Sequence, residues 1–348
     1  MNKFLILLSS LFALTFFGCN NDEEDLDLID TLENEKIAIH EYLSQITTPI
    51  LYLEYYSVHG MLIDTVFIFN YDNSGEVAKD TGWVLMDYEK FYLNGAKLDT
   101  TSPEQGDSTF TYAFGGPVLY RYDTVKKYDY VAEAFRHIGV GSTGGEMIVP
   151  SILAGDKNNY GKPLHYKLKA HKLINDVKVN EYELIQSYLG SSFFVRKPYE
   201  DFPTYEITSV TERDTVTYTA IVEKGAGDRN IQVGDSVLLE MDYGLLDDVG
   251  LQNRVLRSMG RDSIYFLFNE TWQKNYPTGL VKGLQHLQAG DSAHIIVPYG
   301  MAYGAVGTTR EITFRDRTKL KQYLIPPYST LWYWVRIRKV VSPKTEEE

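Results

Sequence analysis

The stretch LVKGLQHLQAGDSAHIIVPYGMAYG, residues 280–304, contains the elements that decide the fold. Leu280, Leu284 and Leu287 recur at the spacing of one face of a short amphipathic helix. Gly290 follows, and glycine takes the left-handed conformation in which helices commonly end. An apolar strand over residues 294–297 comes next, and then a glycine-rich loop that carries Tyr303. The stretch therefore predicts a helix, a strand and a loop in close succession.

The same pattern occurs twice along the chain, and this predicts a tandem duplication. Four blocks recur in one order and at a nearly constant offset: Asn34-Glu35 with Ile39 and Tyr42-Leu43 as Asn180-Glu181 with Ile185 and Tyr188-Leu189, Met86-Asp87-Tyr88 as Met241-Asp242-Tyr243, Phe135-x-His137-Ile138 as Leu284-x-His286-Leu287, and Ile148-Val149-Pro150 as Ile296-Val297-Pro298.

Each copy is predicted to be an α+β domain in which a twisted antiparallel sheet wraps on a short helix. A leading helix precedes each sheet, because Ile39, Tyr42 and Leu43 share one helical face. The closing strand alternates strictly over residues 331–338, with Leu331, Tyr333, Val335 and Ile337 on one face. The predicted domains are residues 34–176 and 177–348, the second with its core at 222–341.

The N-terminus has the pattern of a processing signal. One positive charge and an unbroken apolar run, too short to span a bilayer, end at Cys19, the only cysteine of the chain. The residues FFGC resemble a bacterial lipobox, which implies a signal peptide over 1–18 and an acylated thiol on Cys19. Residues 19–33 are acidic and are predicted to be a solvated tether. We therefore expect a lipid-anchored protein of the bacterial cell envelope, on the outer membrane and facing the periplasm or the surface.

Composition narrows the function further. The 348 residues carry a formal charge of −13, which disfavours a nucleic-acid partner. A single cysteine excludes internal disulfides and multi-thiolate metal sites. His137 and His286 recur at one helical position, and shared ancestry explains this better than a ligand role. We expect neither a metal nor a cofactor.

Several motifs of the second copy together resemble the FKBP-type peptidyl-prolyl cis-trans isomerases. They are the helix register from Gly279 to Asp291, the strand ending at Pro298, Ala302-Tyr303-Gly304, Ile325-Pro326-Pro327, and Leu331-x-Tyr333-x-Val335. The resemblance covers residues 222–341 and, more loosely, 79–173. It implies isomerisation of X-Pro bonds, a reaction that needs no nucleophile, because a dry apolar pocket favours the twisted amide over the planar one.

The resemblance also implies the roles of individual residues. Leu280 takes the position of a tryptophan floor beneath the prolyl ring, and Tyr303 takes that of a tyrosine that donates its hydroxyl to the substrate carbonyl. The residues at wall positions are Tyr243, Phe266, Leu324, Ile325 and Tyr333.

Three features depart from the family pattern. Arg254 stands at the position of the family's wall aspartate. The gapless alignment places Pro277, which has no N–H, where the family binds substrate with a backbone N–H. A shifted alignment would use Val281 instead, with a helix shorter by about one turn. The charged segment over 308–323 is predicted to be a long loop where the family's loop overhangs the site.

The first copy has complementary losses. It keeps Tyr88 and a Leu98-Asp99-Thr100-Thr101 motif close to the family's wall, but it has no Ala-Tyr-Gly and no Ile-Pro-Pro after Pro150. Val131 stands at its floor. We expect this copy to be degenerate.

Two hypotheses about function follow. The first is a prolyl isomerase that acts on exported proteins, mainly through the second copy. The second is a non-catalytic, chaperone-like binding module of the cell envelope, in which both domains have lost the activity.

Overall fold

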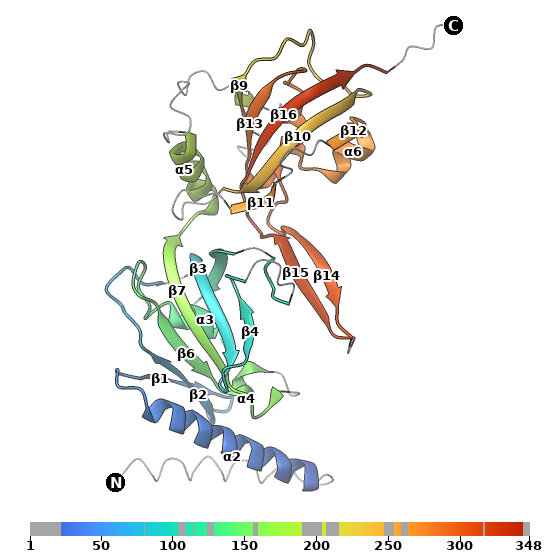
Figure 1. Cartoon of the computed structure of the whole chain (residues 1–348). Helices are drawn as coiled ribbons and strands as arrows, with labels where there is room; N and C mark the ends of the chain where they lie inside the picture. Colours follow the sequence, from blue (N-terminus) through green and yellow to red (C-terminus); the bar gives the residue numbers. More distant parts are fainter. Residues whose placement is uncertain are drawn as a thin grey trace. The chain divides into compact units, whose positions relative to one another are not determined.

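The structure is a computed structural model that describes residues 22–343, apart from 80, 104–108, 114, 124–128, 156–158, 190–203, 207–215, 247–253, 259–263 and 316. The predicted signal peptide and Cys19 lie outside these residues. The chain divides into two compact units, Met1–Thr100 with Tyr120–Leu173 and Thr101–Leu119 with Ile174–Glu348. Each unit is described separately below (Figure 1).

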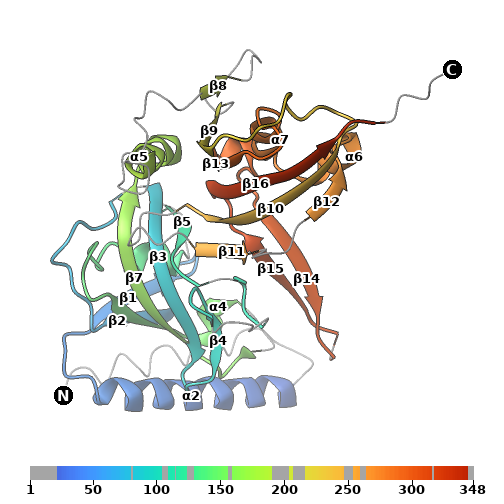
Figure 2. The same ribbon diagram turned by 45° about the horizontal axis from the view of Figure 1, so that its top comes forward.

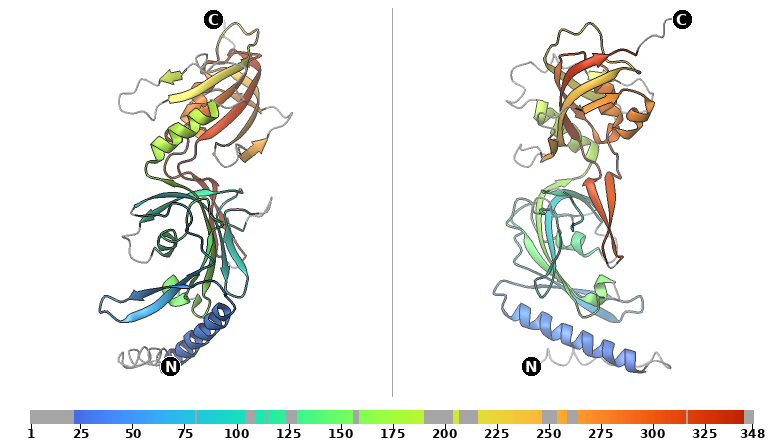
Figure 3. Two further views of the ribbon diagram at one scale, coloured as in Figure 1. Left: turned by 90° about the vertical axis from the view of Figure 1, so that its left-hand side faces the viewer. Right: turned by 45° about the vertical axis from the view of Figure 1, so that its right-hand side comes forward.

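The first unit contains one seven-stranded antiparallel sheet in its described residues, with strand order β1-β2-β6-β7-β3-β4 and β5 paired with β3. The sheet curls around the short helix α3 (Figure 3). The elements are α2 (Asp22–Ser44), β1 (Leu51–Tyr56), β2 (Leu62–Phe69), β3 (Thr81–Tyr92), β4 (Lys97–Thr100), β5 (Val118–Asp123), α3 (Tyr130–Ala134), β6 (Gly145–Val149), α4 (Ser151–Ala154) and β7 (Leu164–Ile174).

The second unit contains a sheet of order β11-β10-β16-β13-β9-β8, with β12 paired with β10, and a separate β14-β15 hairpin. Helix α7 lies against β9 and β13 (Figure 2). The elements are α5 (Val177–Leu189), β8 (Thr204–Glu206), β9 (Val216–Glu223), β10 (Ser236–Leu245), β11 (Arg254–Ser258), β12 (Ile264–Leu267), α6 (Glu270–Asn275), α7 (Thr278–Leu284), β13 (Ser292–Val297), the 3-10 helix η5 (Tyr299–Met301), β14 (Thr308–Thr313), β15 (Lys319–Ile325) and β16 (Leu331–Val341).

The two sheets have the same topology. The first sheet reads β4-β3-β7-β6-β2-β1 and the second β11-β10-β16-β13-β9-β8, so the strands that carry repeated sequence, β3 with β10 and β6 with β13, take the same places, and β5 takes the place of β12. The residue register is also shared, since Ile148 pairs with His165 in the first sheet and Ile296 with Trp332 in the second. The predicted fold, two α+β domains each preceded by a leading helix, is confirmed.

Each leading helix packs on the face of its sheet opposite to the short helix. Ile39 and Leu43 of α2 join Phe69 and Ile148 in one buried cluster. Ile185 and Tyr188 of α5 join Leu246 and Ile296 in another. Because successive strand residues point to opposite faces, Ile295 joins the large inner core while its neighbour Ile296 contacts the α5 side. Both faces of each sheet are therefore covered.

The short helix α7 approaches its sheet closely because two glycines face the strands. A Cβ atom at Gly279 would lie 2.5 Å from both Thr217 Oγ1 and Val297 Cγ1. A Cβ at Gly283 would lie 2.7 Å from Ile295 Cγ2. Real Cβ atoms do not approach so closely, so the glycines set the separation between helix and sheet and with it the depth at which Leu280 is buried.

Two expectations about local structure differ from what is observed. Residues 22–33, expected within the acidic tether, are helical and form the first half of α2. Acidic side chains favour a helix N-terminus because its free N–H groups carry partial positive charge. Residues 308–323, expected as a loop, form most of the β14-β15 hairpin. None of the helices in the described ranges is both long enough and apolar enough to cross a membrane.

The hairpin is paired with a segment that precedes β5 in the sequence and belongs to the same unit. Tyr323 N–H donates to the Thr111 carbonyl at 2.7 Å, and Ala113 N–H donates to the Tyr323 carbonyl at 3.0 Å. The rings of Tyr112 and Tyr323 stack with centroids 5.5 Å apart. These contacts fix β15 at Tyr323, near its C-terminal end.

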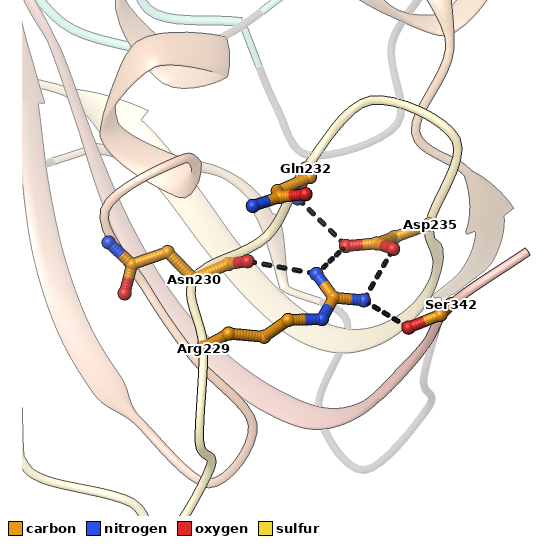
Figure 4. A network of polar contacts seen from close by, with 5 residues as sticks. All are labelled: Arg229, Asn230, Gln232, Asp235 and Ser342. Atoms are coloured by element: carbon orange, nitrogen blue, oxygen red, sulfur yellow. Dashed lines mark hydrogen bonds and ion pairs between the residues drawn. The ribbon is translucent and has the colours of Figure 1, made fainter.

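An ion pair in the connection between β9 and β10 also bonds to the residue that follows the last strand, β16 (Figure 4). The two terminal nitrogens of Arg229 each donate to one carboxylate oxygen of Asp235 at 2.7 Å. One of them, Nη2, also donates to Ser342 Oγ at 2.6 Å. Asp235 is 1% exposed, and its second oxygen also accepts the Gln232 N–H at 2.7 Å. The hydrogen bonds from Arg229 are the main reason why the pKa of Asp235 lies below its usual value.

Substituting Gly283 with alanine should destabilise the second unit. Alanine in a helix normally stabilises by about 1 kcal/mol relative to glycine, but here the added methyl overlaps Ile295. We expect the free energy of unfolding to fall by about 1–3 kcal/mol, as is typical of overpacking. Urea unfolding measures this change. Gly115→Ala is the control, because a Cβ there meets no atom within 4 Å. A stabilised Gly283→Ala variant would contradict the close approach of α7.

Substituting Arg229 with alanine should lower the stability of the second unit at neutral pH, because it leaves the buried Asp235 carboxylate without its partner. The pKa of Asp235 is depressed in the folded state, so the stabilisation is present above the unfolded pKa of about 3.9 and is lost as the pH falls through the folded value. Arg229→Ala should therefore weaken the dependence of stability on pH in this acid range. Urea unfolding from pH 7 to pH 3 tests this.

Lys319→Ala is the matched control for the ion pair, because Lys319 and Glu311 are 2.7 Å apart but about 60% exposed. Exposed pairs contribute about 0–1 kcal/mol. Equal losses in the two variants would show that the Arg229 pair is no stronger than a surface contact.

Candidate active site

The short helix α7 forms the base of the candidate site in the second unit. Leu280 lies in its first turn and is fully buried. The helix begins after Pro277, whose carbonyl accepts the Val281 N–H at 3.1 Å. Val281 thus uses its N–H inside the helix, and Pro277, the residue before the helix, has no N–H.

Two tyrosines from neighbouring strands belong to the apolar cluster that contains Leu280. Tyr243 of β10 and Tyr333 of β16 are paired directly in the sheet register. Their rings stack with centroids 5.5 Å apart and an interplanar angle of 24°. Tyr333 is 2% exposed, while Tyr243 is half-buried. Burial is the main cause that holds the pKa of Tyr333 well above its usual value.

Tyr303 approaches these residues from the loop after η5. The loop is fixed by its own backbone, since Gly304 N–H donates to the Tyr299 carbonyl at 2.9 Å and Gly307 N–H donates to the Tyr303 carbonyl at 3.2 Å. The Tyr303 ring is half-buried and packs against the inner core that contains Leu280. Burial first, and then the neighbouring Tyr243 and Tyr276, raise the pKa of Tyr303 to about 12. Its hydroxyl is therefore protonated at neutral pH and can donate a hydrogen bond.

Most of the expected site residues lie in one contiguous apolar cluster. Phe266 of β12 and Ile325 at the end of β15 are buried, at 9% and 5% exposure. Leu324, next to Ile325 on the strand, is 37% exposed and lies outside this cluster. The expected residues in the cluster are Tyr243, Phe266, Leu280, Tyr303, Ile325 and Tyr333.

The sequence interpretation missed two residues of the same cluster. Tyr276 stands between α6 and α7, is half-buried, and contributes to the raised pKa values of Tyr303 and Tyr333. Met301 of η5 is 7% exposed. The signal for Tyr276 was its place just before Pro277 at the start of the helix, where the chain turns back toward the sheet.

The first unit brings together a different part of the pattern. Tyr88 Oη donates to Asp99 Oδ2 at 2.6 Å, and Leu98 beside it is half-buried. Burial, followed by the charge of Asp99, raises the pKa of Tyr166 to about 12. Tyr166 is the counterpart of Tyr333, because Met147 pairs with Tyr166 as Ile295 pairs with Tyr333. This copy thus keeps a tyrosine–carboxylate pair, while the second copy keeps the buried leucine and the loop tyrosine.

The chemistry open to the second site is defined by apolar contact and one phenol donor. Leu280, Ile325 and Phe266 are buried in the apolar cluster, and the half-buried Tyr303 that packs against it carries a neutral O–H group. In the described ranges, no group of three or more His, Cys, Asp or Glu residues is placed to hold a metal ion. Such a site suits a substrate that needs an apolar pocket and one hydrogen bond to a carbonyl oxygen.

Comparison with known proteins agrees with this description. Residues 227–338 match the family of FKBP-type peptidyl-prolyl cis-trans isomerases. The second unit therefore contains an FKBP-type domain, and the shared strand order makes the first unit a second domain of the same fold. No curated protein sequence matches the chain.

Similar solved structures include FkpA from Escherichia coli, at 18% identity and a TM-score of 0.33, where the match covers 48% of this chain and 60% of FkpA. A peptidyl-prolyl cis-trans isomerase from Pseudomonas syringae pv. tomato matches at 16% identity and a TM-score of 0.32, over 48% of this chain and 94% of that one. The three FKBP domains of wheat FKBP73 match at 15% identity and a TM-score of 0.30, over 80% and 95% of the two chains.

Proposed function

We propose that the protein is a peptidyl-prolyl cis-trans isomerase that acts on proline-containing segments of exported polypeptides, mainly through its second domain. The observation that carries this proposal is that the half-buried Tyr303 packs against the apolar cluster containing Leu280 and Ile325, inside a domain that matches the isomerase family.

The proposed mechanism requires binding and orientation rather than covalent chemistry. Rotation about the X-Pro bond meets a barrier of about 18–20 kcal/mol because it breaks the amide resonance. An apolar pocket that holds the prolyl ring favours the twisted amide, which is less polar at oxygen than the planar form. The Tyr303 hydroxyl would donate to a substrate carbonyl and fix the orientation of the peptide. Its raised pKa keeps it a donor throughout the neutral range.

One observation favours the alternative, a non-catalytic module that holds unfolded or proline-containing polypeptides. Pro277 has no N–H, and the Val281 N–H is already bonded to the Pro277 carbonyl. A substrate in the second domain would therefore lack the backbone donor on which the family relies. Losing this donor weakens the orientation of the substrate more than it weakens apolar binding of the prolyl ring. The loss is therefore compatible with a domain that binds proline segments but isomerises them weakly.

Replacing Tyr303 with phenylalanine should lower kcat/KM for a proline-containing peptide about tenfold, because one hydrogen bond of about 1–2 kcal/mol to the substrate carbonyl is lost. A protease-coupled isomerisation assay of the full-length protein in detergent measures this. Tyr265→Phe is the matched control, since Tyr265 is 64% exposed next to Phe266. It should keep full activity.

The same assay separates the two functions. A wild-type protein that gives no acceleration at concentrations where a related isomerase is active would rule out the enzymatic proposal. If the Tyr303→Phe variant then suppressed the aggregation of a proline-free client as well as the wild type does, this result would favour the binding module.

We also propose that the protein is anchored to a membrane of the bacterial cell envelope through an acylated Cys19. The support is the apolar run of residues 4–17 that ends at Gly18-Cys19 and the acidic residues that follow. A radiolabelled fatty acid such as palmitate should label the wild-type protein in cells but not Cys19→Ser, and only the wild type should sediment with membranes. Equal membrane association of both forms would show that another segment anchors the chain.

A further inference from the structure

Glu181 on the leading helix α5 contacts both chain segments that border the candidate site. Its Oε1 accepts the backbone N–H of Tyr299 at 2.6 Å and the hydroxyl of Thr330 at 2.5 Å. Tyr299 begins the 3-10 helix that leads to Tyr303, and Thr330 ends the turn that starts after Ile325. One carboxylate oxygen therefore connects the segment carrying the proposed hydrogen-bond donor to the segment that follows the apolar wall.

The two segments are also bonded to each other around this carboxylate. Tyr328 N–H donates to the Gly304 carbonyl at 3.0 Å, and the rings of Tyr299 and Tyr328 meet edge to face with centroids 5.3 Å apart. Ser329 Oγ donates to the Pro326 carbonyl at 2.9 Å. Movement of the Glu181 contact would thus act on the loop of Tyr303 and on the Ile325 turn together.

Glu181 is itself held in place by the packing of its helix. Ile185 and Tyr188, one and two turns further along α5, are buried against Leu246 and Ile296 on the outer face of the sheet. Bonds from N–H and O–H groups to a carboxylate are shorter and stronger than neutral hydrogen bonds. Because the helix is packed and the bonds are strong, Glu181 holds the Tyr299 and Thr330 segments in a defined position relative to α5.

The first domain repeats the contact at the equivalent residue. Glu35 of α2 is 4% exposed and accepts the Ser151 N–H at 2.6 Å, the Ser151 hydroxyl, and the Gly161 N–H at 3.1 Å. Ser151 follows Pro150 as Tyr299 follows Pro298. The first domain, however, has no tyrosine in the position of Tyr303. The same structural contact therefore exists in one copy with the loop tyrosine and in one copy without it.

We propose that Glu181 is a positioning residue for the prolyl isomerase site: it holds the Tyr303 hydroxyl at a fixed place relative to Ile325. This inference rests on the proposed function of the second domain. Glu181 does not belong to the apolar cluster and acts through the loop of Tyr303. A purely structural role would instead stabilise the domain without any specific effect on the reaction.

The test uses the full-length protein in detergent, with kcat/KM for a proline-containing peptide measured well below the unfolding temperature of every variant. Glu181→Ala should lower kcat/KM about tenfold, comparable to the effect of Tyr303→Phe. Glu181→Gln keeps an acceptor oxygen for Tyr299 and Thr330 and should recover most of the activity. Glu35→Ala removes the equivalent contact from the first domain and should leave kcat/KM unchanged.

A double variant distinguishes positioning from general destabilisation. If Glu181 acts through Tyr303, then adding Glu181→Ala to Tyr303→Phe should change kcat/KM by less than about twofold, because residues that act through one contact are not additive. Hydrogen–deuterium exchange gives an independent readout: Glu181→Ala should speed exchange in peptides covering 299–304 and 325–330.

Each contrary result has a separate meaning. Full activity of Glu181→Ala, a fully additive double variant, an equal loss in Glu35→Ala, or unchanged exchange in the loop peptides would overturn the positioning role while the activity itself stands. A wild-type protein that does not accelerate isomerisation would overturn the proposed function, and the positioning role with it.

Discussion

The structure depends on the central strand of each domain, whose side chains alternate between the two faces of the sheet. This strand must bury both faces. In β13, Ala293, Ile295 and Val297 point into the inner core, and Ile296 points to the leading helix. A twisted antiparallel sheet with one helix needs only one apolar face. Here the second face is also apolar, so a second helix is required to cover it. The leading helix is therefore part of each domain, and this layer brings Glu35 and Glu181 to the loops beyond the strand prolines.

The two copies contain different parts of the pattern on which the proposed isomerase site rests. The second domain has the buried Leu280, the protonated Tyr303 and the stacked pair of Tyr243 and Tyr333. The first domain has Tyr88 bonded to Asp99 and lacks the loop tyrosine. The proposed reaction requires no reactive side chain, because its barrier is one of lost amide resonance and no covalent bond is formed or broken. Pro277 has no N–H, so the residue before α7 offers no backbone donor.

Much of the fold could be predicted from the sequence, because apolar spacing and strand alternation are local signals and the duplication supplies each signal twice. The short helix, the closing strand and the leading helix all follow from such spacing. The start of α2 could not be placed, because a run rich in Asp and Glu fits both a solvated tether and a helix N-terminus. The β14-β15 hairpin was also missed, because pairs such as Thr309 with Tyr323 become visible only when both strands are in place. At the site, the place of Tyr276 and the exposure of Leu324 depend on how the chain turns near Pro277 and at the end of β15, which spacing does not encode.

The matching carboxylates of Glu35 and Glu181 have a consequence for the history of the chain. Each accepts the N–H of the residue that follows the strand proline in its own domain, although the two loops have since diverged in length and sequence. A contact between segments more than a hundred residues apart is not expected to arise twice at equivalent positions by chance. The shared contact therefore indicates that the duplicated segment included the helix ahead of the sheet, so each copy carries its own three layers.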